Sequence, residues 1–293
     1  VEVQSFALGK YEVTQGEWKN LTGGWNPSYF LGCGLTCPVE NITWLSAAAF
    51  ANAASQAAGF TPCYLFDGVQ CKQGGNPSDP TNYMFCMNAA HGGISDASVS
   101  LRWLASPYQC EGYRLPTESE WEYAYRAGSQ TAIYPSDGNS GLLTDDAWGY
   151  LDGNLDQIGW YEPNSEVSYD GADLCYRSGA PMQTFNCGPH AVAAKEANKW
   201  GLYDLSGNVA EFCGDSKEVY PPGTIASPAV DPWITQSANR VLRGGKYGPF
   251  STADECRGGE RASVGQKSPL RQNGLRLVRS VKAVCVPQCD GME

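Results

Sequence analysis

Cysteine is the residue type with the most chemistry to offer in this chain of 293 residues, which contains twelve of them. They stand at positions 33, 37, 63, 71, 86, 110, 175, 187, 213, 256, 285 and 289. Thiolates bind metals, act as nucleophiles or pair as disulfides. Two histidines, His91 and His190, could complete a zinc site, but the close pair Cys33 and Cys37 has no matching second pair near it. The even number without a metal spacing predicts disulfides and an oxidising compartment.

The disulfide pairing can be predicted from loop length. Short loops close at little entropic cost, so we expect cysteines to pair with their neighbours in sequence. This rule predicts five disulfides, Cys33–Cys37, Cys63–Cys71, Cys86–Cys110, Cys175–Cys187 and Cys285–Cys289. It leaves Cys213 and Cys256, and we expect these two residues to form a sixth disulfide.

The sequence offers little evidence for other catalytic or nucleic-acid-binding functions. The sequence contains no serine-hydrolase, P-loop or dinucleotide-binding motif, and two histidines offer little for a general-base triad. Any two of the 31 acidic residues could be chosen as a glycosidase pair, but no spacing selects them. The net charge of −11 argues against a nucleic-acid partner, because phosphate contacts need a basic face.

The charge is unevenly distributed. Residues 240–282 hold ten basic side chains and three acidic ones, whereas the rest of the chain is strongly acidic. We favour a structural interpretation, in which these arginines pair with carboxylates inside the fold. An anion-binding surface is the alternative.

Three helices are indicated, two of them early in the chain. Capping boxes, in which glutamate follows threonine by three residues, occur at Thr14 with Glu17 and at Thr117 with Glu120. Between them, apolar residues at helical spacing predict a helix over 44–58. These helices need a sheet or a loop-rich remainder to cover their apolar faces.

The rest of the chain is typical of loops and short strands. Residues 60–110 are rich in Gly, Pro, Asn and Cys and lack periodicity, which predicts a disulfide-stapled insertion. Short apolar runs beyond residue 201 predict an irregular antiparallel sheet. No linker divides the chain and no apolar run is long enough to span a bilayer, so we expect a single α+β domain over 1–293 without a membrane span.

Four segments together resemble the formylglycine-generating enzyme family, also called the sulfatase-modifying-factor family. They are GYRLPTESEWEYA (112–124), WGLYDLSGNVAEF (200–212), RVLRGGKYGPF (240–250) and GLRLV (274–278). The resemblance implies a decorated C-type lectin fold with two early helices and a later irregular sheet. Members of the family are either enzymes or non-catalytic display modules.

The catalytic members use two cysteines shortly after the RGG motif, where the thiolates bind copper. Here the corresponding segment, 246–261, contains Cys256 alone. Pro249 and Phe250 cannot replace a soft copper ligand. We therefore expect no copper and no enzymatic activity. A copper-dependent oxidase with a second thiol beside Cys256 is the alternative.

A different branch of the family fits better. Residues 240–279 resemble the variable region of proteins encoded in diversity-generating retroelements, in which a frame of fixed residues separates exchangeable ones. The frame is present at Arg243, Gly244, Gly245, Cys256, Arg257, Arg261, Pro269, Arg271, Gly274, Leu275 and Arg276. The resemblance implies ligand contacts between the frame positions, and we nominate Lys246, Tyr247, Gly248, Pro249, Phe250, Glu260, Ser263, Gln266 and Lys267.

The motif DLSGNVAE carries a cofactor hypothesis. In calcium-bearing relatives the matching positions supply side-chain oxygens at Asp204 and Glu211 and backbone carbonyls at Gly207 and Val209. A hard divalent cation prefers such oxygen ligands. An Asx-turn at Asp204 with an ion pair at Glu211 is the alternative.

Together these features predict a monomeric display protein, secreted or held at the cell surface, whose C-terminal segment binds a protein ligand. Val1 is not an initiator methionine, so we expect a removed targeting segment, and a lipid anchor is compatible with the sequence. A calcium-dependent carbohydrate-binding module is a further alternative. Its Glu-Pro-Asn tripeptide occurs here at 162–164, outside the region that matches the lectin long loop.

Overall fold

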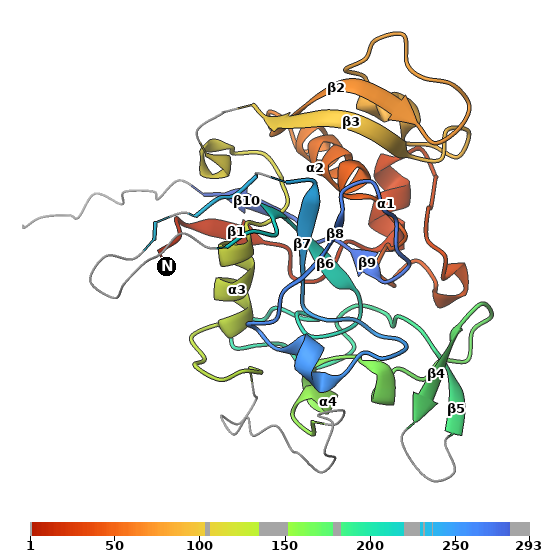
Figure 1. Cartoon of the computed structure of the whole chain (residues 1–293), viewed down its shortest axis with the longest axis vertical. Coiled ribbons are helices and arrows are strands. Elements are labelled where there is room, and N and C mark those ends of the chain that lie inside the picture. Colours follow the sequence, from red (N-terminus) through yellow and green to blue (C-terminus); the bar gives the residue numbers. More distant parts are fainter. Residues whose placement is uncertain are drawn as a thin grey trace, which may run out of the picture.

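The three helices expected from the sequence are present in the computed structural model of this chain (Figure 1). The structure describes residues 2–102, 106–134, 152–177, 183–219, 229–230, 232–235 and 237–281. Both capping boxes form, with the side chains of Thr14 and Thr117 accepting hydrogen bonds from the backbone of Glu17 and Glu120. The α-helices are α1 (Gln15–Leu21), α2 (Trp44–Ala57), α3 (Glu118–Arg126) and a short α4 (Leu155–Ile158).

The strands form one four-stranded sheet and three two-stranded ones. The larger sheet has the order β8-β7-β6-β9, from β6 (Ala210–Ser216), β7 (Asn239–Arg243), β8 (Ala262–Gly265) and β9 (Asn273–Gly274). Its first three strands run antiparallel, as expected, but β9 is parallel to β6. The two-stranded sheets pair β1 (Phe6–Leu8) with β10 (Val278–Ser280), β2 (Tyr64–Cys71) with β3 (Ile94–Leu101), and β4 (Asp173–Arg177) with β5 (Gln183–Cys187).

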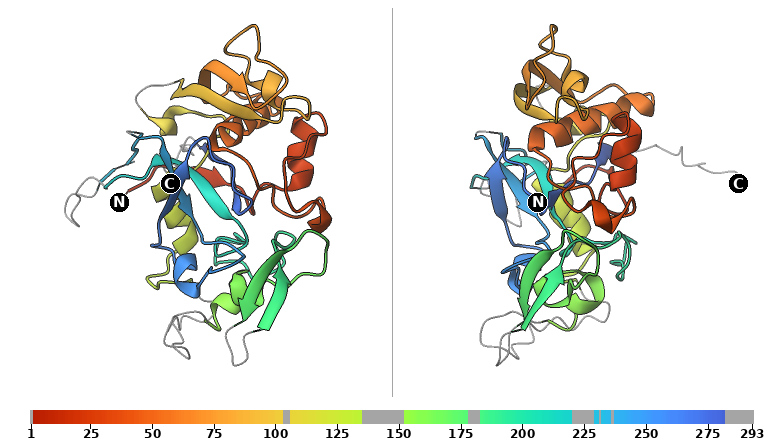
Figure 2. Two further views of the ribbon diagram at one scale, coloured as in Figure 1. Left: turned by 45° about the vertical axis from the view of Figure 1, so that its right-hand side comes forward. Right: turned by 90° about the vertical axis from the view of Figure 1, so that its right-hand side faces the viewer.

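The apolar core lies between the early helices and the central sheet. Its largest cluster packs α1 and α2 against β2, β3, β6 and β7 through residues such as Trp18, Phe50 and Phe212. A second cluster joins α3 to the sheet around Trp121 and Tyr125. Hairpin β2–β3 lies beyond α2 at one end of the molecule, and hairpin β4–β5 lies at the other end (Figures 1 and 2). In the described part of the chain, no helix has the length and apolar character to cross a membrane.

Five 3-10 turns complete the described elements. They are η1 (Leu31–Cys33), η2 (Tyr83–Cys86), η3 (Pro107–Gln109), η4 (Glu162–Asn164) and η5 (Ala253–Cys256). The last of these follows the RGG motif, so the segment expected to carry ligand contacts begins as an irregular loop and a short turn rather than as a strand.

The insertion contains more regular structure than its composition predicts, and its disulfide pairing differs from the prediction. The disulfides are Cys63–Cys110 and Cys71–Cys86, so the predicted pairs Cys63–Cys71 and Cys86–Cys110 are wrong. Cys63 directly precedes β2 and Cys71 ends it, and eight residues of extended strand span roughly 26 Å. A disulfide needs Cα atoms within about 7 Å of each other, so the strand forbids the shorter loop.

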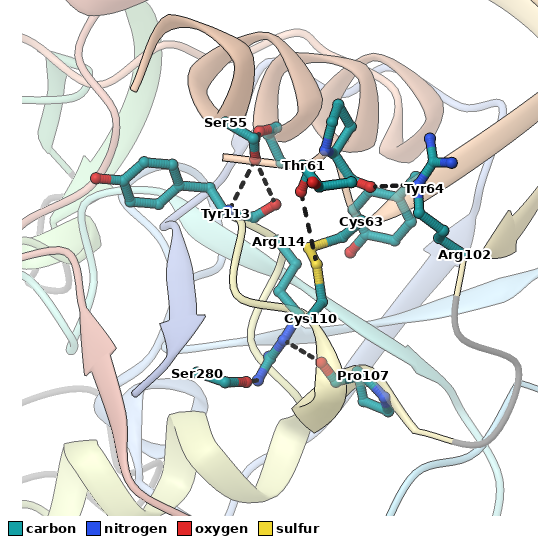
Figure 3. The surroundings of a disulfide bond; sticks show 12 residues. Ser55, Thr61, Cys63, Tyr64, Arg102, Pro107, Cys110, Tyr113, Arg114 and Ser280 are labelled. Carbon is teal, nitrogen blue, oxygen red and sulfur yellow. Dashed lines mark hydrogen bonds between the residues drawn. A yellow bond between two sulfur atoms is a disulfide. The ribbon is translucent and has the colours of Figure 1, made fainter. Parts of the chain in front are cut away.

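The Cys63–Cys110 disulfide ties the start of the insertion to the segment that leads into α3 (Figure 3). Beside it, the backbone N–H of Tyr113 donates to Ser55 Oγ on α2 at 2.8 Å. Arg114 donates to the carbonyl of Pro107 and bidentately to Glu120. This disulfide therefore lies where the insertion, α2 and the N-terminus of α3 meet.

The predicted disulfides Cys33–Cys37 and Cys175–Cys187 are confirmed. The predicted sixth disulfide is wrong, because Cys213 on β6 and Cys256 on η5 are both buried free thiols. The predicted pair Cys285–Cys289 lies outside the described residues. The four disulfides of the described part fit the oxidising compartment that the cysteine content predicts.

Candidate functional site

The RGG motif forms the turn that leaves β7, and its geometry requires glycine. Gly244 and Gly245 have φ values of 95° and 74°, which are left-handed conformations that disfavour side chains. A Cβ at Gly245 would lie 2.5 Å from Cys256 Sγ, and a Cβ at Gly244 would lie 3.1 Å from the carbonyl of Leu205. The turn therefore packs tightly on η5 and on the DLSGNVAE segment.

Arg243, which opens the motif, is buried and anchors the loop that follows. Its Nη2 donates to Glu122 Oε2 and to the carbonyl of Gly258, both at 2.6 Å, and its Nη1 donates to the carbonyl of Glu260. The guanidinium also lies over the Trp121 ring, 5.0 Å from its centroid. One side chain thus holds α3 and two backbone positions of the loop together.

Arg276 is the centre of a second buried network. Its guanidinium contacts both carboxylate oxygens of Glu211, the shortest contact being 2.6 Å, and also donates to the carbonyls of Gly9 and Tyr203. Trp121 Nε1 donates to the same carboxylate at 2.7 Å. The structural interpretation of the C-terminal arginines applies to this residue and to Arg243.

Two more carboxylates lie near this ion pair. Glu12 is fully buried and accepts hydrogen bonds from the Asn208 side chain and the Val209 backbone. Burial, followed by the nearby charges of Asp204 and Glu211, raises the pKa of Glu12 well above its usual value. Burial also raises the pKa of Asp204 to about 6. The guanidinium of Arg276 is therefore the nearby positive charge for three buried carboxyl groups, those of Glu211, Glu12 and Asp204.

The other frame arginines differ in burial. Arg261 forks onto both oxygens of Glu118, at 2.5 and 2.6 Å. Arg257 was expected to be structural as well, but its side chain is 35% exposed and pairs with Asp254 three residues earlier. Arg257 therefore does pair with a carboxylate, but this ion pair is partly exposed, unlike the buried pairs of Arg243 and Arg276.

The geometry around Glu211 does not present a ready calcium site. Both oxygens of Glu211 already accept hydrogen bonds from Arg276 or Trp121, as the ion-pair alternative predicts. Asp204 Oδ2 accepts from the Ala193 N–H at 2.6 Å, which leaves Oδ1 as a buried oxygen without a partner among the described residues. Within the same residues, no group of three or more His, Cys, Asp and Glu side chains is arranged to hold a metal ion.

Calcium at Asp204, Gly207, Val209 and Glu211 therefore stays a prediction, and one that this arrangement does not favour. A bound ion would have to displace Arg276 from Glu211, and we expect the melting temperature to be the same with and without excess EGTA. Thermal unfolding in calcium-supplemented and EGTA-containing buffer checks this. A melting temperature that falls on chelation would instead support the calcium site, because a ligand bound to the native state stabilises it.

The predicted contacts Lys246, Glu260 and Ser263 converge on one cavity of about 190 Å³ beside the RGG turn. Lys246 Nζ lies 3.5 Å from Glu255 Oε2 at this cavity. Both donor and acceptor groups therefore line it. These three residues come from the loop after β7 and from the start of β8, so the tertiary fold brings them together.

Asn273 was not among the predicted contacts, yet it lines the same cavity. Its side chain is almost fully buried, and its Nδ2 has no hydrogen-bond partner among the described residues. A buried donor without a partner is costly unless a ligand or water satisfies it. Its position directly before Gly274 of the frame is the sequence feature from which it could have been predicted. Its place at this cavity, however, depends on the parallel pairing of β9 with β6.

Tyr247 was expected to be an exposed contact, and this expectation is wrong. Its ring is fully buried and packs edge-on against Phe30, with the ring centroids 5.3 Å apart. Its hydroxyl lies 3.2 Å from the carbonyl oxygen of Arg271 and 3.3 Å from Asp173 Oδ2, and its single proton can be donated to either acceptor. Gly248 beside it is also buried. Tyr247 therefore belongs to the scaffold that links the loop to β4.

The remaining nominated residues lie away from the cavity lining. Phe250 is 71% exposed, and its ring stacks loosely on Tyr176 of β4 at 6.4 Å. Pro249 beside it is half-buried. Gln266 accepts a hydrogen bond from Arg240 at 3.0 Å. Lys267 pairs with Asp96 of β3 at 2.6 Å, on the exposed side of the insertion.

The tripeptide Glu162-Pro163-Asn164 forms η4 and is used structurally. Glu162 accepts hydrogen bonds from the backbone N–H groups of Tyr176 and Phe250, at 2.9 and 2.7 Å. Asn164 accepts from Tyr161 N–H and donates to the carbonyl of Gly159. These groups are engaged within the chain, so this geometry gives no support to a sugar site at the tripeptide.

The two free thiols are unsuited to chemistry in this conformation. Burial raises the pKa of Cys213 well above its usual value, and the charges of Glu118 and Asp215 add to the shift. Burial also raises the pKa of Cys256 to about 12, with a further contribution from Glu255. Both thiols are therefore protonated near neutral pH, whereas metal binding and nucleophilic attack need the thiolate.

The fold and this site define a loop-rich α+β domain of the C-type lectin type, with an arginine-anchored loop beside the central sheet. The family model described as "Sulfatase-modifying factor enzyme 1-like domain" matches residues 1–281. The chain therefore belongs to the sulfatase-modifying-factor family, that of the formylglycine-generating enzymes.

The similar proteins include a variable protein, a chaperone and an enzyme. The solved structure of Treponema denticola variable protein 1 is 28% identical, covers 96% of this chain and 86% of its own, and superposes with a TM-score of 0.66. The chaperone protein LppX of Paenibacillus barcinonensis is 29% identical over 214 residues, which are 73% of this chain and 63% of the relative. The formylglycine-generating enzyme of Streptomyces coelicolor is 30% identical over 187 residues, which are 62% of this chain and 46% of the enzyme. The chain thus spans about half to two thirds of the length of these two relatives.

Proposed function

We propose that this protein is a non-catalytic ligand-binding module, displayed outside the cell, which binds a protein ligand through the surface beside the RGG turn. The observation that carries the proposal is the cavity lined by Lys246, Glu260, Ser263 and Asn273, with its unpartnered buried Asn273 Nδ2. A donor of this kind suits a carbonyl or carboxylate oxygen of a ligand.

The scaffold around the cavity supports the same proposal. Buried Arg243 holds the loop through backbone carbonyls and Glu122, and buried Arg276 holds the opposite end of the segment through Glu211. Among the residues that the structure describes, the side chains of Lys246, Glu260 and Ser263 make no comparable buried contacts. Side chains at these positions can therefore change without removing the frame, as in loops that bind diverse partners.

Support for a role without catalysis comes from the thiols and from the Treponema neighbour. Protonated, buried Cys213 and Cys256 are poor candidates for copper ligands. One solved structure that covers 96% of the chain is that of a variable protein. The four described disulfides support a location outside the cell, and the proposal takes the module to act as a monomer.

Phage-displayed random peptides provide a probe for this surface. Peptides selected on the native protein should bind at least tenfold more weakly to Lys246→Ala or Ser263→Trp, because the first change removes a charge at the cavity and the second fills it. Lys19→Ala on α1 is the matched control and should bind as the unchanged protein does. Binding is measured by interferometry, with melting temperatures recorded for each variant.

The variants should melt within a few degrees of the unchanged protein, since exposed substitutions usually alter stability little. Selected peptides that bind all cavity variants and the Lys19 control equally would place ligand binding elsewhere. A lowered melting temperature for Ser263→Trp would mark it as a folding defect, and Lys246→Ala would then decide the result alone.

A further inference from the structure

A second cavity lies apart from the RGG surface. Its volume is about 590 Å³, which lies in the usual range of small-molecule sites. It lies between β1, α1, the C-terminal half of α2 and β10, and it shares no lining residue with the cavity beside the RGG turn. Much of its wall is apolar, from residues that include Leu8, Val13, Leu21, Phe50, Ala54 and Leu277.

Two cations, Lys10 and Arg279, belong to the lining of this cavity. Within the described part of the chain, neither forms an ion pair, whereas Arg243, Arg261 and Arg276 all pair with glutamate. Each instead lies over an aromatic ring. Lys10 Nζ is 5.2 Å from the centroid of the Tyr203 ring, and Arg279 Cζ is 4.8 Å from that of Phe60.

The carboxylate of Glu17 also lines the cavity, but it caps helix α1. Glu17 accepts hydrogen bonds from the backbone N–H and the hydroxyl of Thr14, at 2.8 and 2.9 Å, as part of the capping box of α1. It therefore does not neutralise Lys10 or Arg279 through an ion pair. The polar part of the lining has an excess of positive charge in a chain whose net charge is −11.

We propose that this cavity binds an amphipathic anion with a single carboxylate and an alkyl tail, such as a medium-chain fatty acid. The tail would occupy the space between α1 and α2, beside Leu21, Phe50 and Ala54. The carboxylate would lie between Lys10 and Arg279, whose side chains need only leave their aromatic neighbours. The apolar residues of the lining require an alkyl tail, and its two cations require a negative head group.

Charge complementarity selects this class over others. A neutral alkyl ligand would leave both cations unused, and a cationic amphiphile would be repelled by them. A polyanion such as nucleic acid would meet the strongly acidic remainder of the chain. An acidic, apolar peptide shares the required chemistry, and the experiment distinguishes it from the fatty acid.

Isothermal titration of the native protein with sodium dodecanoate, kept below its micelle concentration, tests the proposal. We expect saturable binding with one site, and a melting temperature that rises with dodecanoate. Dodecyltrimethylammonium should not compete, because it has the same tail and the opposite charge. Butanoate should bind at least a hundredfold more weakly, since its tail has eight fewer methylenes to bury in the cavity.

Variants assign the binding to this cavity. Lys10→Glu and Arg279→Glu should each weaken dodecanoate binding at least tenfold, and Ala57→Trp should abolish it by filling the space beside α2. Lys19→Glu and Gln56→Trp, which stand near these positions but do not line the cavity, are matched controls that should bind normally.

Several outcomes would overturn the proposal. They are no binding of dodecanoate, equal binding of the cationic amphiphile, equal loss in the control variants, or a melting temperature that falls with dodecanoate as in detergent unfolding. An acidic apolar peptide that binds where dodecanoate does not would likewise reject the fatty-acid class. The peptide-selection experiment on the RGG surface is independent, because none of these variants touches that cavity.

Discussion

Replacing Arg276 with alanine is expected to lower the free energy of unfolding by about 3 to 5 kcal/mol, a large part of the stability of a typical domain. The change removes the cation that contacts both oxygens of Glu211, and it leaves the carbonyls of Gly9 and Tyr203 without that donor. Glu12 and Asp204 are buried nearby, so three carboxyl groups lose their common counter-charge. Urea unfolding followed by tryptophan fluorescence measures the effect.

Two further variants test whether the loss of stability depends on the burial of the arginine. Arg257→Ala removes a half-exposed guanidinium paired with Asp254 and should change the free energy of unfolding by less than about 0.5 kcal/mol. Arg276→Lys keeps the charge but loses the fork that contacts Glu211, so it should fall between the two. Equal losses for Arg276→Ala and Arg257→Ala would show that the frame arginines do not act through this buried network.

Removing the Cys63–Cys110 disulfide is expected to cost about 4 kcal/mol, against about 2 kcal/mol for Cys33–Cys37, because the chain-entropy cost grows with loop length. The sequence separations are 47 and 4 residues. Paired Cys→Ala variants of each disulfide, unfolded by urea under oxidising conditions, provide the comparison. The Cys63–Cys110 disulfide also joins the insertion to the segment beside α2 and α3, so its removal should destabilise both the insertion and that segment.

The order of the two values is the critical result. A larger loss for the Cys33 and Cys37 pair would contradict the loop-length argument and would indicate that local packing decides the contribution of each disulfide. Peptide mapping of the unchanged protein under non-reducing conditions provides the control, because it should recover Cys63 linked to Cys110 and Cys71 linked to Cys86.

The proposed binding surface and the proposed amphiphile cavity make different demands on the fold. The first depends on side chains that the arginine-anchored loop presents beside the central sheet. The second depends on the packing of α1 and α2 against the strands β1 and β10, which pair residues near the two ends of the described chain. Ligand binding at one site can therefore be tested while the other is intact.

Local interactions allowed much of the architecture to be predicted from the sequence. The helices after Thr14 and Thr117 begin where the capping boxes place them, because side chain and backbone lie three residues apart. The family motifs predicted the lectin-type fold, which the family match and the Treponema structure confirm. The disulfides Cys33–Cys37 and Cys175–Cys187 were likewise predictable, since short loops bring these residues close together.

Contacts between distant segments were decided by the tertiary structure alone. Strand β2 holds Cys63 and Cys71 apart. The segment after β2 brings Cys86 of η2 back to Cys71, and the antiparallel β3 then returns the chain toward Cys63, which pairs with Cys110. Tyr247 is buried because the loop after Gly245 folds onto Phe30, which lies more than two hundred residues earlier. Asn273 reaches the cavity through its pairing beside β6. Periodicity and loop length describe neighbours along the chain, whereas burial and cavity lining depend on which strands pair and which side chains then share the same space.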